Sequence, residues 1–219
     1  MIVNAVDLPL RCGCGAWRGV LRSVAPGRGN RCVCYCDDCQ SFAFYLGRAD
    51  SILDAHGGTD IFQTSPARLE ITSGHEHFAC MRLRPRSRVV RWFASCCRTP
   101  IGNTPAEAGV PLVGVIHSCM DLEATGHSAD ALLGPVRGSA FPRFSRGEPA
   151  QLPKKLGVLH ILRMVGIILA ARLRREQRRS PFFHADGKLK MMPHVLSAED
   201  LQAIETTRDA APAMPPPPS

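Results

Sequence analysis

Seven cysteines of this chain occur in three short groups whose spacing suits metal binding. In an extended segment residues i and i+2 point the same way, so a C-x-C pair offers two thiolates to one ion at about 2.3 Å each. A disulfide inside such a pair would be badly strained. The seven thiols are enough for two zinc ions. They are Cys12 and Cys14 in RCGCGAW, Cys34, Cys36 and Cys39 in CYCDDC, and Cys96 and Cys97 in ASCCRT.

The stretch RCVCYCDDCQ leaves three interpretations open. In the first, Cys34, Cys36 and Cys39 bind one zinc ion from a short knuckle and leave its fourth position for water or an incoming thiol. In the second, Cys32 completes a closed four-cysteine site, and the ion is purely structural. In the third, the same thiols stay free of metal and act as a redox switch.

Two cysteines and two histidines stand outside these groups. Cys80 and Cys119 occur singly in apolar segments, where cysteine usually serves as a small core residue. His75 and His77 have the spacing of a ligand pair, but no third partner lies near them in the sequence. We expect both histidines to be polar residues at the start of a strand.

The N-terminal segment bears on the compartment. MIVNAVDLPLRCGCG has no basic leading region and no long apolar run, so it does not resemble a secretory signal peptide. We therefore expect a cytoplasmic location, and clustered cysteines in a reducing compartment favour zinc over disulfides.

The composition is that of an ordinary globular protein, with 219 residues, 45% hydrophobic and 21% charged, which argues against a disordered or membrane class. The formal net charge is +8, and it favours acidic partners. The excess is local, because residues 153–180 contain one acid, Glu176, against a set of basic residues: Lys154, Lys155, Arg163, Arg172, Arg174, Arg175, Arg178 and Arg179.

The first half of the chain, residues 1–118, has the texture of a domain built from short strands. Short apolar runs between turn signals predict these strands: 20–24, 69–72, 78–83, 89–93 and 112–117. The strands must bring the three cysteine groups together. We therefore expect a mainly β zinc-binding domain here.

The second half, residues 119–207, is predicted to be an extension with a basic helix over about 154–178 that begins at Pro153. His160 and Arg163 interrupt its apolar run, so we expect the helix to pack on the β-domain and not to span a membrane; a helix that lies on a membrane surface is the alternative. Ser197 precedes Asp200 by three residues, which predicts the N-terminus of a short helix. Residues 208–219 end in a proline-rich tail that is expected to be disordered.

The cysteine groups resemble those of the GFA/CENP-V family, named for glutathione-dependent formaldehyde-activating enzymes. The resemblance covers about residues 8–118 and implies a small zinc-ribbon-like GFA β-domain with two zinc sites. The family's C-H-C-x-x-C motif falls on Cys34 to Cys39, with Tyr35 in place of histidine, and it implies an exposed three-cysteine site that a thiol can join.

The family's structural four-cysteine site is represented by Cys12 and Cys14 and by a later F-C-x-x-C-G motif. That motif falls on Phe93 to Arg98, so Cys97 is retained, the first cysteine is replaced by Ala94 and the glycine by Arg98. Cys96 is then the available fourth ligand, although two adjacent residues seldom bind one ion without a distorted turn.

Three functions follow as expectations. The resemblance implies a zinc-dependent carbon–sulfur lyase that acts on adducts between glutathione, or another small thiol, and an aldehyde. The alternative is a non-catalytic, zinc-stabilised binding module whose basic helix contacts an acidic partner such as nucleic acid. A thiol redox sensor ranks third. The sequence assigns no residue to catalysis or to glutathione binding.

Overall fold

The computed structural model describes residues 4–147 and 156–212, and these residues form a mainly β fold, as predicted. Strands β1, β2 and β5 form a three-stranded sheet, and the other eight form a sheet in the order β10-β3-β4-β9-β8-β7-β6-β11. The strands are β1 (Val6–Arg11), β2 (Arg18–Val24), β3 (Asn30–Cys34), β4 (Thr59–Thr64), β5 (Leu69–Ser73), β6 (Phe78–Arg82), β7 (Val89–Ala94), β8 (Thr99–Pro105), β9 (Val113–Ile116), β10 (Ser139–Ala140) and β11 (His194–Val195).

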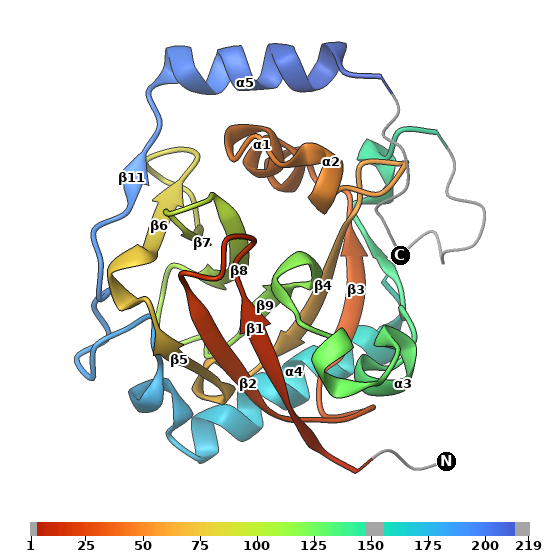
Figure 1. The fold of residues 1–219 in the computed structure, drawn as a ribbon, viewed down its shortest axis with the longest axis vertical. Coiled ribbons are helices and arrows are strands. Elements are labelled where there is room, and N and C mark those ends of the chain that lie inside the picture. Colours follow the sequence, from red (N-terminus) through yellow and green to blue (C-terminus); the bar gives the residue numbers. More distant parts are fainter. Residues whose placement is uncertain (1–3, 148–155, 213–219) are drawn as a thin grey trace.

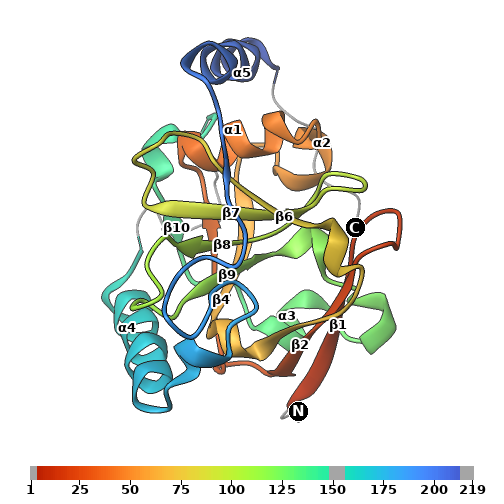
Figure 2. The ribbon, with the colours of Figure 1, turned by 90° about the vertical axis from the view of Figure 1, so that its left-hand side faces the viewer.

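The helices lie around the two sheets (Figures 1 and 2). Helix α5 crosses the top of Figure 1 above α1, while α4 lies at the opposite end of the molecule. The α-helices are α1 (Asp37–Tyr45), α2 (Ala49–Ile52), α3 (Ala129–Leu133), α4 (Val158–Leu173) and α5 (Ala198–Ala210). Short 3-10 helices are η1 (Pro66–Arg68), η2 (His75–His77), η3 (His117–Cys119), η4 (Glu123–Thr125), η5 (Pro142–Phe144) and η6 (Glu176–Arg179).

The predicted strands correspond to β2, β5, β6, β7 and β9, with ends that differ by a few residues. Strands β1, β3, β4 and β8 were not predicted. In β3 all five residues are buried, so the apolar–polar alternation that marks a strand exposed on one face is missing.

The region after residue 118 is part of the same fold and not an appendage. Strands β10 and β11 come from this region and pair in parallel with β3 and β6, at the two outer edges of the eight-stranded sheet. Phe182 is fully buried in the core, where its ring centroid lies 4.8 Å from that of Trp92 and 5.8 Å from that of Phe78. The predicted boundary at residue 118 therefore does not separate two independent cores.

Three helix predictions need correction. Residues 156 and 157 are not helical and α4 begins at Val158, while the predicted start at Pro153 lies outside the described residues. Helix α4 ends at Leu173, and Arg175 adopts a positive φ of 54° before η6. We also predicted that α4 packs on the β-domain. It does so over a small area, because only His160 and Ala171 of this helix are fully buried.

The C-terminal helix begins as its sequence predicts. The hydroxyl of Ser197 accepts a hydrogen bond from the backbone amide of Asp200 at 3.0 Å, which satisfies one free donor of the first turn. Helix α5 continues to Ala210, so the predicted tail at 208–219 begins inside a helix. Residues 213–219 lie outside the described part of the chain.

Candidate metal centres

A four-cysteine cluster joins two segments that are more than 80 residues apart in the sequence. A tetrahedral ion with metal–sulfur distances of about 2.3 Å has sulfur–sulfur edges of about 3.8 Å. The thiols match this size: Cys12 and Cys14 are 3.5 Å apart, Cys12 and Cys96 3.6 Å, Cys14 and Cys96 3.4 Å, and Cys96 and Cys97 3.9 Å. All four sulfurs lie within 4.8 Å of one another. The donor set and its dimensions therefore fit a closed zinc site.

The loop after β1 and the turn between β7 and β8 hold these thiols in place. The backbone amide of Trp17 donates to the Cys12 sulfur at 3.2 Å, a contact that stabilises a thiolate. In the turn, Arg98 adopts a φ of 58°, the left-handed conformation that favours glycine. This turn lets two adjacent cysteines face the same cluster.

Thr99 couples the cluster to the sheet. Its hydroxyl lies 3.1 Å from the Cys97 sulfur and accepts a hydrogen bond from the Gly13 amide at 2.9 Å. Burial raises the pKa of Cys97, but hydrogen bonds from Thr99 and Cys14 outweigh it and lower that pKa to about 6. Cys97 therefore favours the thiolate, the form that binds metal.

A three-cysteine cluster lies where β3 passes into α1. Cys34 ends β3, Cys36 is the N-cap of α1, and Cys39 lies in its first turn. The sulfurs of Cys34 and Cys36 are 3.4 Å apart, and all three lie within 4.8 Å of one another. The motif is thus a strand-to-helix junction and not the knuckle that we predicted.

The helix start gives this cluster a preference for negative charge. The amide of Cys39 donates to the Cys36 sulfur at 3.4 Å, and the positive end of the helix dipole lies at the same place. Hydrogen bonds from Cys34 and Cys36, together with the positive charge of Arg91, hold the pKa of Cys39 well below its usual range despite burial. Cys39 is therefore the thiol of the triad that favours the thiolate form, whereas the shared hydrogen bonds and burial raise the pKa of Cys34, and the pKa of Cys36 is raised to about 12.

Arg91 is the main charged neighbour of the triad, and our sequence analysis missed it. Its side chain is 3% exposed, and its Nη1 lies 3.7 Å from the Cys39 sulfur and 3.3 Å from the amide oxygen of Asn103. The nearest carboxylate oxygen, on Asp38, is 4.0 Å away. A lone arginine inside the apolar run VVRWFA was the available signal, because a buried cation needs an anionic partner.

Cys32 is not among the thiols that converge on this site. It is 2% exposed, and burial raises its pKa to about 12, which favours the neutral thiol. Cys80 and Cys119 are buried single cysteines, as expected, and the Cys119 thiol donates to the Ile116 carbonyl at 3.2 Å. The structure therefore assembles seven of the ten cysteines into two clusters and leaves the other three in the core.

The triad is more enclosed than the resemblance implied. Cys34 and Cys39 are only 8% and 7% exposed, while Cys36 is half-buried. Ala140 and Leu156, both from the region after residue 118, pack against the cluster. The expectation of an exposed triad is thus wrong for two of its thiols, and Cys36 provides the solvent-facing side.

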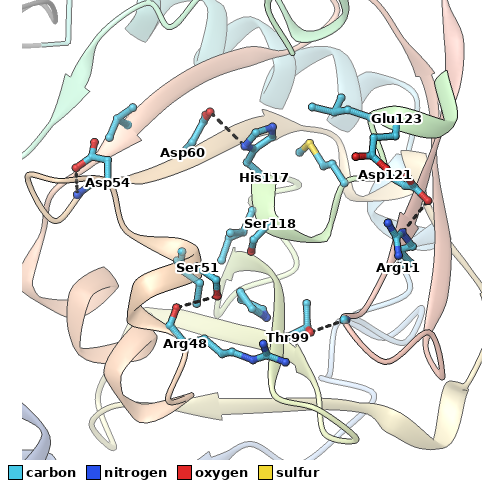
Figure 3. Close-up of a pocket in the computed structure, with 18 residues that line it drawn as sticks. Arg11, Arg48, Ser51, Asp54, Asp60, Thr99, His117, Ser118, Asp121 and Glu123 are labelled. Atoms are coloured by element: carbon cyan, nitrogen blue, oxygen red, sulfur yellow. Dashed lines mark hydrogen bonds and ion pairs between the residues drawn. The ribbon is translucent and has the colours of Figure 1, made fainter. Parts of the chain in front are cut away.

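A pocket of about 640 Å³ lies beside β3 (Figure 3). Val33 lines it, and the neighbouring cysteines of β3 alternate to the opposite face. Among its charged groups, Asp60 lies 2.6 Å from the buried Arg31 and 3.9 Å from His117. No cysteine lines this pocket, but Gly13, Arg48 and Thr99 do. Because Thr99 contacts the Cys97 sulfur and Arg48 donates to the Cys97 carbonyl, the pocket adjoins the four-cysteine cluster.

No helix in the described part of the chain is long and apolar enough to cross a membrane.

Comparison with known proteins gives a family but no function. The model of a family of unknown function, DUF6151, matches residues 4–191. No curated protein matches the chain. A crystal structure of a Rhodobacter sphaeroides protein is similar with 16% identity and a TM-score of 0.38, over 54% of this chain and 95% of that one.

Proposed function

We propose that this chain, which belongs to the DUF6151 family of unknown function, is a two-zinc protein with one closed and one open thiolate site. Cys12, Cys14, Cys96 and Cys97 would hold the closed site, and Cys34, Cys36 and Cys39 the open one. The open site would admit a small thiol such as glutathione. This is the arrangement that a GFA-like zinc domain requires.

The observation that carries this proposal is the convergence of three thiols beside one buried cation. Three thiolates and Zn²⁺ together have a net charge of −1, which the guanidinium of Arg91 balances. No fourth cysteine, histidine or carboxylate of the described residues belongs to the cluster. Three protein ligands with one free position are characteristic of catalytic zinc, whereas four are characteristic of structural zinc.

The four-cysteine cluster supports the GFA-like interpretation at the two positions where the sequence departs from the family motif. Cys96 lies within 3.6 Å of both Cys12 and Cys14 and so replaces the ligand lost at Ala94. Arg98 adopts the positive φ that the family's glycine would supply. Both departures are therefore compatible with a closed site in the same place.

The reaction that we propose splits or forms an adduct between a small thiol and an aldehyde. In the splitting direction the carbon–sulfur bond breaks, the sulfur keeps the electron pair, and the adduct hydroxyl passes its proton to water as the carbonyl forms. When bound, zinc would act as a Lewis acid that stabilises the departing thiolate. Arg91 and the N-terminus of α1 provide the electrostatic environment for that charge, and Cys36 marks the side from which the thiol enters.

A non-catalytic binding module is the second candidate. It is favoured by the exposed arginines that follow α4, which give the chain a surface for an acidic partner. In this case both zinc ions would only stabilise the fold. The response of the triad to thiols separates the two candidates.

The test uses Cys36→Ser, with Cys32→Ser as the control at a cysteine four residues earlier that lies outside the cluster. We expect two zinc ions per native chain, one in Cys36→Ser with the fold retained, and two in Cys32→Ser, as measured by metal analysis and circular dichroism. In the cobalt-substituted native protein, glutathione should change the thiolate-to-cobalt absorption. The lyase proposal is excluded if no small thiol changes this spectrum, and the open site is excluded if Cys36→Ser keeps both ions.

A further inference from the structure

Helix α4 exposes a continuous apolar face. Its exposed apolar side chains recur at the spacing of one helix face, with Leu162 61%, Leu169 53% and Leu173 86% exposed. Figures 1 and 2 both show α4 at the periphery of the molecule. The exposed apolar face consists of Val158, Leu159, Ile161, Leu162, Val165, Leu169 and Leu173.

A second feature adjoins this face. A pocket of about 460 Å³ lies between α4 and the turn before β3, and four arginines line it. The Nη1 of Arg163 and the hydroxyl of Thr64 are buried there without a hydrogen-bond partner among the described residues. Such groups are suited to a phosphate, which accepts several hydrogen bonds from arginine. We call this the arginine pocket, and its charged and hydroxyl residues are Arg28, Arg68, Arg163, Arg174, Thr64, Ser65 and Glu176.

The apolar face and the arginine pocket meet on the same helix. Gly166 is exposed between the two, and it lines the pocket together with Ala170. Beyond the pocket, the C-terminal end of α4 and η6 add exposed positive charge. The exposed arginines of this end are Arg172, Arg174, Arg175, Arg178 and Arg179.

The charges decide between the possible partners of this surface. A second copy of the chain would bring the same arginines to its own contact, and Glu176 is the only acid in residues 156–180. Nucleic acid would satisfy the arginines but has no counterpart for exposed leucines and valines. An anionic membrane offers both an apolar interior and phosphate groups, and basic amphipathic helices bind at its surface.

We propose that α4 docks this protein onto an anionic phospholipid membrane, with the apolar face inserted at the surface and the arginine pocket bound to a lipid phosphate. The helix lies in the plane of the membrane and does not cross it. This role is independent of the thiol chemistry proposed above, because α4 contributes no cysteine.

The test measures binding of the full chain to vesicles by flotation. Vesicles of phosphatidylcholine with about one third phosphatidylserine are compared with vesicles of phosphatidylcholine alone. The face variant is Leu162→Gln/Leu169→Gln, with Met192→Gln as its control, because Met192 is 94% exposed outside α4. The pocket variant is Arg163→Gln/Arg174→Gln, with Arg86→Gln/Arg88→Gln as the control that removes the same charge.

We expect the native chain and both controls to bind the anionic vesicles, and the face and pocket variants to bind at least tenfold more weakly. Because the replaced leucines are exposed, unchanged thermal unfolding should show that the face variant is folded. Absence of vesicle binding by the native chain overturns the proposal, as does native-like binding by the face variant. Binding of inorganic phosphate is measured in a separate titration. If phosphate binds in the arginine pocket and the chain does not bind vesicles, the pocket is a site for a soluble anion and the membrane proposal is excluded. A dimer that the face variant dissociates, again without vesicle binding, identifies a second copy as the partner.

Discussion

Replacement of Arg91 with glutamine removes the buried charge that faces the three-cysteine cluster. The guanidinium Nη1 is 3.7 Å from the Cys39 sulfur. At this distance two unit charges interact by about 4 kcal/mol with an effective dielectric constant of about 20. The negative charge of a zinc trithiolate is spread over three sulfurs, and glutamine keeps a hydrogen-bond donor. We therefore expect a loss of about 2 kcal/mol, which is about 30-fold in zinc affinity at this cluster.

The assay is competition for zinc against a chromophoric chelator, with the two bound ions followed as separate steps. Arg91→Gln should weaken only one step, because no residue of the four-cysteine cluster contacts Arg91 by a hydrogen bond or ion pair in the described structure. Arg84→Gln is the matched control. Arg84 also faces Asp38, at 2.6 Å, but its side chain is 48% exposed, so we expect a change of no more than about threefold.

Arg91→Lys tests charge separately from shape. Lysine keeps the positive charge, so it should restore most of the affinity that glutamine loses. The reasoning is refuted if Arg91→Gln binds both ions as the native protein does, or if both steps weaken equally. In the second case Arg91 would act on the fold as a whole and not on the triad.

Two further predictions concern stability. Cys14→Ser should lose one zinc ion and at least about 3 kcal/mol of unfolding free energy in urea, because it opens the closed site that joins β1 to the β7–β8 turn; a stable variant with both ions would disprove the assignment. His160 is buried, and its ring nitrogens have no hydrogen-bond partner among residues 4–147 and 156–212; burial and then the charges of Arg137 and Arg163 lower its pKa. The unfolded state therefore binds more protons than the folded state at acidic pH, so stability should fall as the pH drops below about 6.5, and His160→Leu should make urea midpoints at about pH 7.5 and pH 5.5 more nearly equal. An unchanged pH dependence in the variant would count against this role of His160.

The cysteine spacing predicted the composition of both clusters but not their surroundings. Thiols at i and i+2 face one ion in several backbone geometries, so the sequence grouped Cys34, Cys36 and Cys39 without indicating that a helix begins between them. Arg91 reaches the triad from a strand more than 50 residues later; the arginine inside the apolar run VVRWFA indicates a buried cation, but it does not identify the anionic partner. The sequence indicated the role of Cys96 only indirectly. Cys96 is an extra cysteine close to Ala94, the position at which the family motif has lost its cysteine.

Helix α4 shows what a hydrophobic pattern in the sequence does not predict about burial. An apolar pattern on most sides of a helix predicts burial, and it does not show which side is buried. Here the sheet covers only the side that carries His160 and Ala171, and the remaining apolar residues face outward. Burial depends on what packs against the helix, and that is set by the rest of the chain.

The two short strands β10 and β11 have a consequence for how this fold avoids aggregation. An open sheet edge offers unpaired amides and carbonyls that can recruit a strand from another molecule. In this chain β10 and β11 occupy both edges of the eight-stranded sheet, and each spans only two residues, too few to template an added strand. In a chain that ends at residue 118, β3 and β6 would become the edge strands of this sheet, and both are longer than two residues. The first 118 residues alone should therefore self-associate through backbone hydrogen bonds between edge strands. The segment that follows the β-domain thus protects the sheet edges from pairing with strands of other molecules.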